Sequence, residues 1–288
     1  MLLLLALLLI LAGALWAVLT GRADPRLQII GTKLSGAFPA LTWMDVLRSL
    51  PPYYLRPYKT VFVRLKARGQ PPCPALFDTP LGSFWGRNDD RVALELVVFE
   101  ELANTYQRGS VIVRPGDVVF DLGAHLGTFA AVALRRGARL VVALEPEPVN
   151  AACIEKTFQD EIAQGRLVLV KAAAWDAPGT LHFGGTGLLG KIEGADAAAT
   201  FSVPATTIDL TVERLRLDRV DFIKMDIEGA ERQALAGARN TLARFGPRMA
   251  LCIYHLPDDP ALLPRLARAA RPAYRVFTNP TRKQAFFE

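Results

Sequence analysis

The chain has 288 residues, about half of them hydrophobic, so it is long enough to bury one large core. Its formal net charge of +6 is modest, and no basic cluster is interleaved with aromatic residues, which argues against a nucleic-acid partner. The three cysteines, Cys73, Cys153 and Cys252, are odd in number and show no metal-ligand spacing. We expect them to be small buried side chains in a reducing compartment.

An uncharged apolar run from Leu2 to Thr20 approaches the roughly 20 residues that cross a bilayer as a helix. It predicts an N-terminal transmembrane helix within residues 1–21. A cleaved signal peptide is the alternative, but no basic residue precedes the run, and the small residues at 12–14 lie inside it. Three basic residues follow it closely: Arg22, Arg26 and Lys33. The positive-inside tendency therefore predicts a single-pass membrane protein whose main domain is cytoplasmic.

Residues 22–74 are predicted to form a juxtamembrane linker. A short helix is expected over 41–50, ended by two prolines, and an edge strand over 61–65. Between them, residues 53–59 mix tyrosines with basic residues, which either lie at a membrane interface or pack against the domain. The turn-rich stretch 69–74 marks the boundary, so the main domain is placed at 75–288.

Residues 91–107 predict an amphipathic helix that covers a sheet. Its apolar stripe consists of Val92, Leu96, Phe99, Ala103 and Tyr106. Glu95, Glu100 and Glu101 lie off that stripe and so outside the expected packing face.

From Val118 onward, strand and helix patterns alternate. Strands are predicted over 118–121, 140–145, 167–171, 220–226 and 249–254. Helices are predicted over 128–136, 148–163, 209–216, 229–244 and 260–270. This alternation implies an α/β fold with a doubly wound, mostly parallel sheet. A Gly- and Ala-rich loop or hairpin is expected over 184–199, and a closing hairpin over 274–277 and 284–287.

The stretch from Val118 to Gly127 reads as a buried strand, a tight glycine turn and a helix start. A nicotinamide cofactor would favour Gly-x-Gly-x-x-Gly after this strand, whereas here Gly123 and Gly127 follow an acid, Asp121. A carboxylate next to the turn would attract the cationic S-adenosyl-L-methionine, whereas it would repel the negatively charged diphosphate of a nicotinamide cofactor. Glu145, at the end of the second strand, is placed to accept the ribose hydroxyls, although either cofactor would use it so. The alternatives are that Asp121 caps the next helix and that Glu145 is a solvated loop acid.

Three segments then resemble the hallmark segments of FkbM-type methyltransferases, which have the class I methyltransferase fold. They are Phe120–Phe129, Leu144–Asn150 and Val220–Glu231, and the resemblance covers roughly residues 85–255. The third segment is the most specific, since many class I methyltransferases share the first two. One departure is His125, which stands where the family usually has Asn. The resemblance implies methyl transfer from S-adenosyl-L-methionine, usually to a hydroxyl oxygen, with His125 among the cofactor-binding residues.

Lys224, Asp226 and Glu228 share one face if the fourth strand continues to Glu228. An alcohol is a poor nucleophile, so a nearby base would help, and the candidates are Asp226, Glu228 and His255. The alternatives are that Glu228 is a first-turn carboxylate favoured by the helix dipole and that His255 is a buried, satisfied histidine. Asp226 and Glu228 could hold a divalent ion, but nothing requires one, and no metal is predicted.

The sequence thus predicts a membrane-anchored O-methyltransferase that acts on a hydroxyl of a glycan, a lipid-linked sugar or another small metabolite. Two rivals are a nicotinamide-dependent oxidoreductase and a non-catalytic, membrane-tethered binding module with the same fold. We expect the residues that choose the acceptor to lie within 53–110 and 184–204. The sequence does not indicate an oligomeric state.

Overall fold

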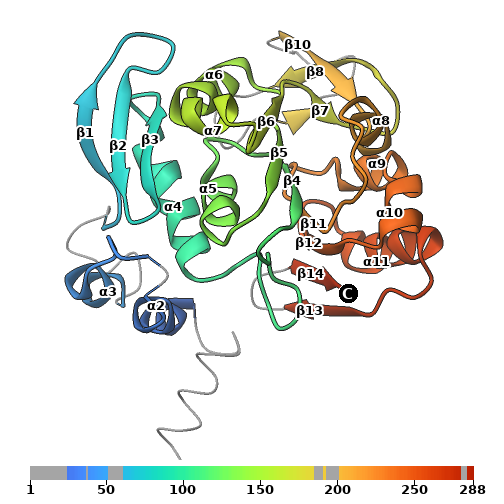
Figure 1. Ribbon diagram of the computed structural model, residues 1–288, viewed down its shortest axis with the longest axis horizontal. Helices are drawn as coiled ribbons and strands as arrows, with labels where there is room; N and C mark the ends of the chain where they lie inside the picture. The colour runs from blue at the N-terminus through green and yellow to red at the C-terminus, as the bar shows by residue number, and fades with distance from the viewer. Residues whose placement is uncertain (1–24, 37, 51–60, 185–190, 193–200, 280–283) are drawn as a thin grey trace, which may run out of the picture.

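The computed structural model describes residues 25–36, 38–50, 61–184, 191–192, 201–279 and 284–288. Its centre is a seven-stranded sheet with the order β13-β14-β12-β11-β4-β5-β6 (Figure 1). The strands are β4 (Val118–Leu122), β5 (Leu140–Leu144), β6 (Leu167–Val170), β11 (Phe222–Met225), β12 (Arg248–Cys252), β13 (Val276–Asn279) and β14 (Gln284–Phe287). The chain enters this sheet at β4 and continues outward through β5 and β6. It then crosses back to the other side of β4, where it forms β11 and β12. The predicted doubly wound, mostly parallel sheet is therefore confirmed.

The strands form where the sequence has short apolar runs. All five residues of β4 are buried, as are all four of β11, because both strands are covered on both faces. β4 pairs in parallel with β5 and β11, and its register places Asp121 beside Lys224. Only β14 runs antiparallel to its neighbours, β12 and β13, so the predicted closing hairpin is also confirmed.

Two hydrophobic clusters cover the two faces of this sheet. Residues of β4 alternate between them, with Val119 in one cluster and Val118 and Phe120 in the other. The first cluster includes residues of α4 (Asp90–Leu102), α5 (Thr128–Arg135) and α6 (Pro148–Thr157). The second includes residues of α8 (Ile208–Arg214), α9 (Glu231–Ala236), α10 (Arg239–Phe245) and α11 (Asp259–Ala270). The result is a three-layer arrangement with the sheet in the middle (Figure 1).

Two helices predicted as continuous are divided in the structure. The predicted helix 148–163 forms α6 and the short α7 (Gln159–Ala163), which meet at Phe158. The predicted helix 229–244 forms α9 and α10, which are separated by Gly237 and Ala238. A Cβ at Gly237 would collide with the carbonyl oxygen of Trp175, so the chain approaches another backbone closely at this break.

Before α4, the described residues form two helices and a small antiparallel sheet. The helices are α2 (Pro25–Leu34) and α3 (Trp43–Ser49), and the strands are β1 (Arg64–Arg68), β2 (Ala75–Thr79) and β3 (Gly82–Gly86). Ile29, Leu41 and Val46 belong to the same hydrophobic cluster as α4 and α5. Strand β3 lies against α6, so this small sheet flanks the main one (Figure 1). The boundary placed at residues 74 and 75 stays a prediction.

The predicted membrane localisation is wrong, because the structure contradicts it. No helix in the described part of the chain has both the length and the apolar character needed to cross a bilayer. The apolar run from Leu2 to Thr20, on which the prediction rested, lies outside the described residues, as do residues 53–59.

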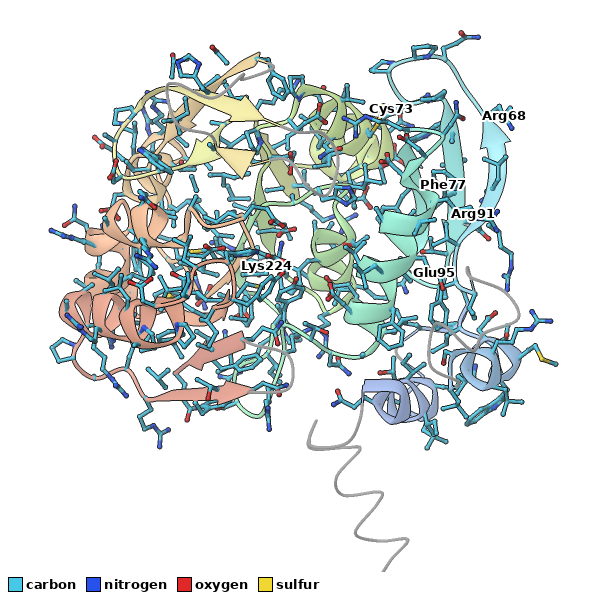
Figure 2. The ribbon with its side chains drawn as sticks, turned by 180° about the vertical axis from the view of Figure 1, so that it is seen from behind. Arg68, Cys73, Phe77, Arg91, Glu95 and Lys224 are labelled. Atoms are coloured by element: carbon cyan, nitrogen blue, oxygen red, sulfur yellow. A yellow bond between two sulfur atoms is a disulfide. The ribbon has the colours of Figure 1, made fainter. Side chains whose placement is uncertain are left out.

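Helix α4 has a different packing face from the one predicted. Val92 and Leu96 are 57% and 51% exposed, whereas Glu95 and Glu101 are buried. The carboxylate of Glu95 accepts hydrogen bonds from the backbone N–H groups of residues 61, 62 and 63, at 2.7 to 3.0 Å. These donors compensate the buried charge, which is why Glu95 can lie on the buried face of the helix. The apolar stripe predicted from the sequence therefore lay on the wrong face. Figure 2 shows Glu95 on the side of α4 toward the segment that leads into β1.

A second small sheet lies on either side of the loop or hairpin expected over 184–199. Its order is β7-β10-β8-β9, from Ala173–Ala174, Phe201–Thr206, Gly179–Gly184 and Lys191–Ile192. Strand β8 pairs antiparallel with both β9 and β10, which fits the hairpin alternative. Residues 185–190 and 193–200 lie outside the described ranges.

The cysteines are not all unpaired. Cys73 and Cys153 form a disulfide with their Cα atoms 5.6 Å apart, which corrects the expectation of three separate thiols. The bond joins the turn before β2 to α6, across 80 residues of sequence. Cys252 is buried and unpaired, as expected.

Candidate active site

A cleft with an empty volume of about 850 Å³, open to solvent, lies at the carboxyl ends of β4, β5 and β11. This is the edge of an open α/β sheet where ligands bind, next to the point where the strand order reverses. Residues from several segments meet there. They include Gly123, His125, Glu145, Asn150, Lys224, Asp226 and Glu228, together with Glu101 and Tyr106 from α4 and the turn after it.

The turn after β4 is held tightly against its neighbours. The N–H groups of Gly123 and Ala124 both donate to the carbonyl oxygen of Leu144, at 3.0 and 3.1 Å. Gly123 has a φ of +73°, and a Cβ there would collide with the carbonyl oxygen of Asp226. Only glycine therefore lets the turn after β4 and the turn at Asp226 approach each other.

The second glycine serves a different purpose. Gly127 has a φ of +85° and occupies the N-cap position of α5. A Cβ at this position would collide with the ring of Phe158 on the helix side, and Gly127 does not line the cleft. Its predicted role in cofactor binding stays a prediction, and its visible role is helix packing.

His125 has a left-handed backbone, with a φ of 52°. Asn and His are both enriched in that conformation, which gives a physical reason why His can stand where the family usually has Asn. The residue is 8% exposed, and neither ring nitrogen has a hydrogen-bond partner among the residues described. Burial, reinforced by the charges of Lys224 and Arg87, lowers its pKa to about 4, so the ring is neutral. An unpaired neutral ring therefore faces the cleft.

Glu145 follows β5 and is 5% exposed. One carboxylate oxygen accepts from the His125 N–H at 2.8 Å, and the other accepts from the Glu147 N–H at 3.0 Å and from Nδ2 of Asn150 at 3.3 Å. Burial raises its pKa to about 7, although these hydrogen bonds oppose the shift. Arg87 in turn pairs with Glu147 and donates to Oδ1 of Asn150, so the small flanking sheet helps to hold Glu145 in place.

Asp121 and Lys224 form a buried ion pair beneath the cleft. Nζ of Lys224 lies 3.1 Å from Oδ1 of Asp121 and donates to the carbonyl oxygen of Gly123 at 2.8 Å. Burial raises the pKa of Asp121, and Lys224 offsets part of that rise. Lys224, which is labelled near the centre of Figure 2, lines the cleft, whereas Asp121 does not. The predicted contact between Asp121 and the cofactor stays a prediction.

Asp226, Glu228 and His255 come together on the opposite wall from Glu145. Nε2 of His255 lies 3.5 Å from Oδ1 of Asp226 and 3.6 Å from Oε2 of Glu228. Its Nδ1 lies 2.9 Å from Oε1 of Glu231, a fully buried carboxylate. Burial lowers the pKa of His255, but the three neighbouring carboxylates outweigh burial and leave it above its ordinary value. The structure thus brings all three predicted catalytic residues into one cluster.

A turn, and not a continuing strand, brings these acids together. β11 ends at Met225, so Lys224, Asp226 and Glu228 do not share a strand face as the prediction required. Glu228 adopts a left-handed φ of 55° and Gly229 follows with 98°. Helix α9 begins only at Glu231, so Glu228 is not the first-turn carboxylate of the alternative interpretation.

Sequence reasoning missed two residues on this wall. The hydroxyl of Tyr106 donates to Oδ2 of Asp226 at 2.5 Å, and burial together with the Asp226 charge raises its pKa well above the usual range. Glu101 is buried beside Lys224 and lines the cleft. Tyr106 and Asp226 are 120 residues apart, so no local pattern signals their contact. The helical periodicity of α4 would have placed Glu101 on the buried face only if an acidic residue had been allowed on that face.

Comparison with known proteins identifies the family. A sequence model of the methyltransferase FkbM domain matches residues 121–269, just over half of the chain. The chain belongs to the FkbM methyltransferase family. The resemblance noted from the three sequence segments is confirmed, and all three segments fall within or overlap the matched region. A search of curated protein sequences finds no match.

Solved methyltransferase structures share parts of the architecture. The FkbM methyltransferase of Methylobacillus flagellatus KT is 21% identical, with a TM-score of 0.48, and the match covers 70% of this chain and 56% of that one. Fibrillarin of Aeropyrum pernix, solved with S-adenosyl-L-methionine, is 14% identical, with a TM-score of 0.37, and 61% and 66% are covered. The chain therefore spans less than two thirds of either protein.

An FkbM methyltransferase uses S-adenosyl-L-methionine as its cofactor, and the cleft suits that molecule. Glu145 keeps lone pairs for hydroxyl donors, the His125 ring nitrogens are unpaired, and the glycine at position 123 leaves room along the backbone. The donor set on this wall therefore matches a ligand that carries a ribose and an adenine.

Proposed function

We propose that this FkbM methyltransferase transfers the methyl group to a hydroxyl oxygen of a small acceptor, such as a sugar or another hydroxylated metabolite. The observation that supports this is the cluster of Asp226, Glu228 and His255 on the wall opposite Glu145. A hydroxyl group needs help to lose its proton, and carboxylates beside a buried histidine can supply that help.

In this proposal the cofactor wall consists of Gly123, His125 and Glu145. Glu145 accepts the ribose hydroxyls, because its position is fixed by two backbone donors and by Asn150. The backbone at Gly123 and the ring of His125 provide the remaining surface. When bound, the cofactor supplies a methyl group on a positively charged sulfur.

On the acceptor wall, Asp226 and Glu228 line the cleft, whereas His255 does not. The carboxylates are therefore the catalytic candidates, and His255 is a positioning residue that holds them. Asp226 accepts the hydroxyl proton while its other oxygen stays bonded to Tyr106 at 2.5 Å. Most of the rate enhancement comes from holding the reacting atoms in line at about 3 to 3.5 Å, so a fixed carboxylate matters more than a strong base.

Part of the region expected to choose the acceptor does line the cleft. Val97, Glu101 and Tyr106 contribute to it, and all three fall within residues 53–110. Two of these side chains are polar and one is apolar, which suits a polyhydroxylated molecule with a carbon skeleton. The other predicted region, 184–204, lies mostly outside the described residues.

A labelling experiment tests the proposal. The purified protein is incubated with ¹³C-methyl-labelled cofactor and a metabolite extract, and the labelled products are examined by NMR and mass spectrometry. A methyl ether is expected, and it should disappear with Asp226→Asn. Label on nitrogen or on a carboxylate, or cofactor binding without any transfer, would contradict transfer to a hydroxyl. The last outcome would instead support a non-catalytic binding module.

A further inference from the structure

We propose that Asp226, Glu228 and His255 form a binding site for one divalent first-row metal ion, with Mn²⁺ and Zn²⁺ as the best-suited ions. From the sequence, Asp226 and Glu228 could hold a divalent ion, but His255 lies 27 residues beyond Glu228, so the sequence did not indicate a third ligand. Carboxylate oxygens suit Mn²⁺, and imidazole suits Zn²⁺, so a site with both ligand types favours these ions over Mg²⁺.

The distances between the three side chains are those of ligands around a shared ion. One ligand atom from each residue lies within 4.8 Å of the other two. Nε2 of His255 is 3.5 Å from Asp226 and 3.6 Å from Glu228. Bonds of about 2.1 Å at a tetrahedral angle would separate two ligand atoms by about 3.4 Å. The two distances from His255 already match this spacing, and the pair Asp226 and Glu228 lies within 4.8 Å.

Buried atoms without partners point into the same space. The side chain of His255 is 7% exposed, and its Nε2 makes no hydrogen bond in the described part of the chain. Oδ1 of Asp226 is likewise buried and unpaired there, while Oδ2 is occupied by Tyr106. Buried polar atoms are nearly always satisfied in native proteins, by protein, water or an ion. A cation between these two atoms would satisfy both at once.

Glu231 contacts both His255 and the turn that carries the two acidic ligands. Its Oε1 lies 2.9 Å from Nδ1 of His255 and accepts the Ile227 N–H at 3.0 Å. A hydrogen on Nδ1 that faces this carboxylate leaves the lone pair on Nε2, which is the tautomer that can bind a metal. The bond to Ile227 also fixes the turn that carries Asp226 and Glu228. One fully buried carboxylate therefore orients all three ligands.

The ion would bind the hydroxyl group of the acceptor. Three protein ligands leave at least one coordination position open, as in catalytic metal sites, and Asp226 and Glu228 already line the cleft. This role rests on the transfer to oxygen proposed above, whereas binding of the ion does not. In the step, the acceptor hydroxyl would occupy the open position, and its proton would go to Asp226, the base of the proposed function. The lone pair of the hydroxyl oxygen forms the bond to the methyl carbon, and the electrons of the broken carbon–sulfur bond stay on sulfur.

Titration with Mn²⁺ alone tests the site without any methyl transfer. Tag-free protein is treated with EDTA, dialysed and titrated while free Mn²⁺ is measured by electron paramagnetic resonance, with Zn²⁺ as a competitor. The wild type should bind one ion per chain. His255→Ala and Glu228→Gln should weaken binding at least about tenfold, and Glu231→Gln by about 10- to 100-fold. The control variants are His182→Ala, an exposed histidine on β8, and Glu155→Gln, an exposed acid, and both should bind as the wild type does.

Two results would overturn the metal site. One is that the wild type binds neither Mn²⁺ nor Zn²⁺, and the other is that His255→Ala and Glu228→Gln bind Mn²⁺ as tightly as the wild type. Calorimetric binding of S-adenosylhomocysteine to each variant shows that it is folded. Mn²⁺ binding without transfer to any hydroxyl would contradict the proposed function alone, whereas transfer that survives EDTA, with no Mn²⁺ bound, would contradict the metal site alone.

Discussion

Glu145 should make the stability of the cofactor-free protein fall as pH rises. Burial raises its pKa from the ordinary 4.5 to about 7, so folding favours the protonated carboxyl. Since the pKa is raised on folding, the stability associated with this group is fully present below pH 4.5 and is lost as pH rises through about 7. Replacing the residue with glutamine removes this dependence, because the amide does not ionise.

The size of the effect follows from the shift. Each pH unit between the two pKa values corresponds to about 1.4 kcal/mol, which gives roughly 3 kcal/mol over the whole range. Part of this is already lost at pH 5, so about 2.5 kcal/mol separates pH 5 from pH 8.5. For a domain of this size that corresponds to roughly 5 to 10 °C in melting temperature. Glu145→Gln also loses one acceptor for a backbone N–H, at a cost of about 1 to 3 kcal/mol that does not vary with pH.

Thermal and urea unfolding of the two cofactor-free proteins between pH 5 and pH 8.5 measures the difference. The stability advantage of the wild type over Glu145→Gln should shrink by about 2.5 kcal/mol across that interval. Stability curves that run parallel from pH 5 to pH 8.5 would refute the raised pKa of Glu145, and with it the view that this carboxylate is held in a dry site.

Three further substitutions test separate parts of the structure. Gly123→Ala should destabilise the protein by more than about 2 kcal/mol in urea unfolding, because its Cβ meets the Asp226 carbonyl, while Gly179→Ala, with open space around it, should stay within about 0.5 kcal/mol. Glu95→Gln should cost about 1 to 3 kcal/mol by the same measurement, and exposed Glu155→Gln almost nothing; equal losses would contradict the anchoring role of Glu95. Tyr106→Phe should lower turnover about tenfold with cofactor affinity unchanged, and an unchanged rate would remove Tyr106 from the site.

The central sheet could be predicted from the sequence because its strands are short apolar runs buried on both faces. β4, β5, β6, β11 and β12 each fall within two residues of the predicted range. The shortened glycine pattern of Gly123 and Gly127, together with Asp121, carried the cofactor assignment. Local composition decides whether a strand is two-sided and whether a turn can be tight.

The rest depended on contacts that no local pattern records. The phase of α4 was wrong because Glu95 finds three backbone donors about 33 residues away in sequence. The disulfide between Cys73 and Cys153 spans 80 residues. Tyr106 reaches Asp226 because α4 packs against α5, where the Tyr106 ring meets Phe129. Acidic side chains that are buried with distant partners resemble solvent-facing ones in the sequence, so tertiary structure alone reveals them.

The division of the cleft into a cofactor wall and an acceptor wall is tested most directly by calorimetric titration with S-adenosylhomocysteine. The wild type should bind it, Glu145→Gln should lose affinity by at least about tenfold, or 1.4 kcal/mol, and Asp226→Asn should bind within about twofold of the wild type. Unchanged affinity in Glu145→Gln, or a large loss in Asp226→Asn, would contradict the division.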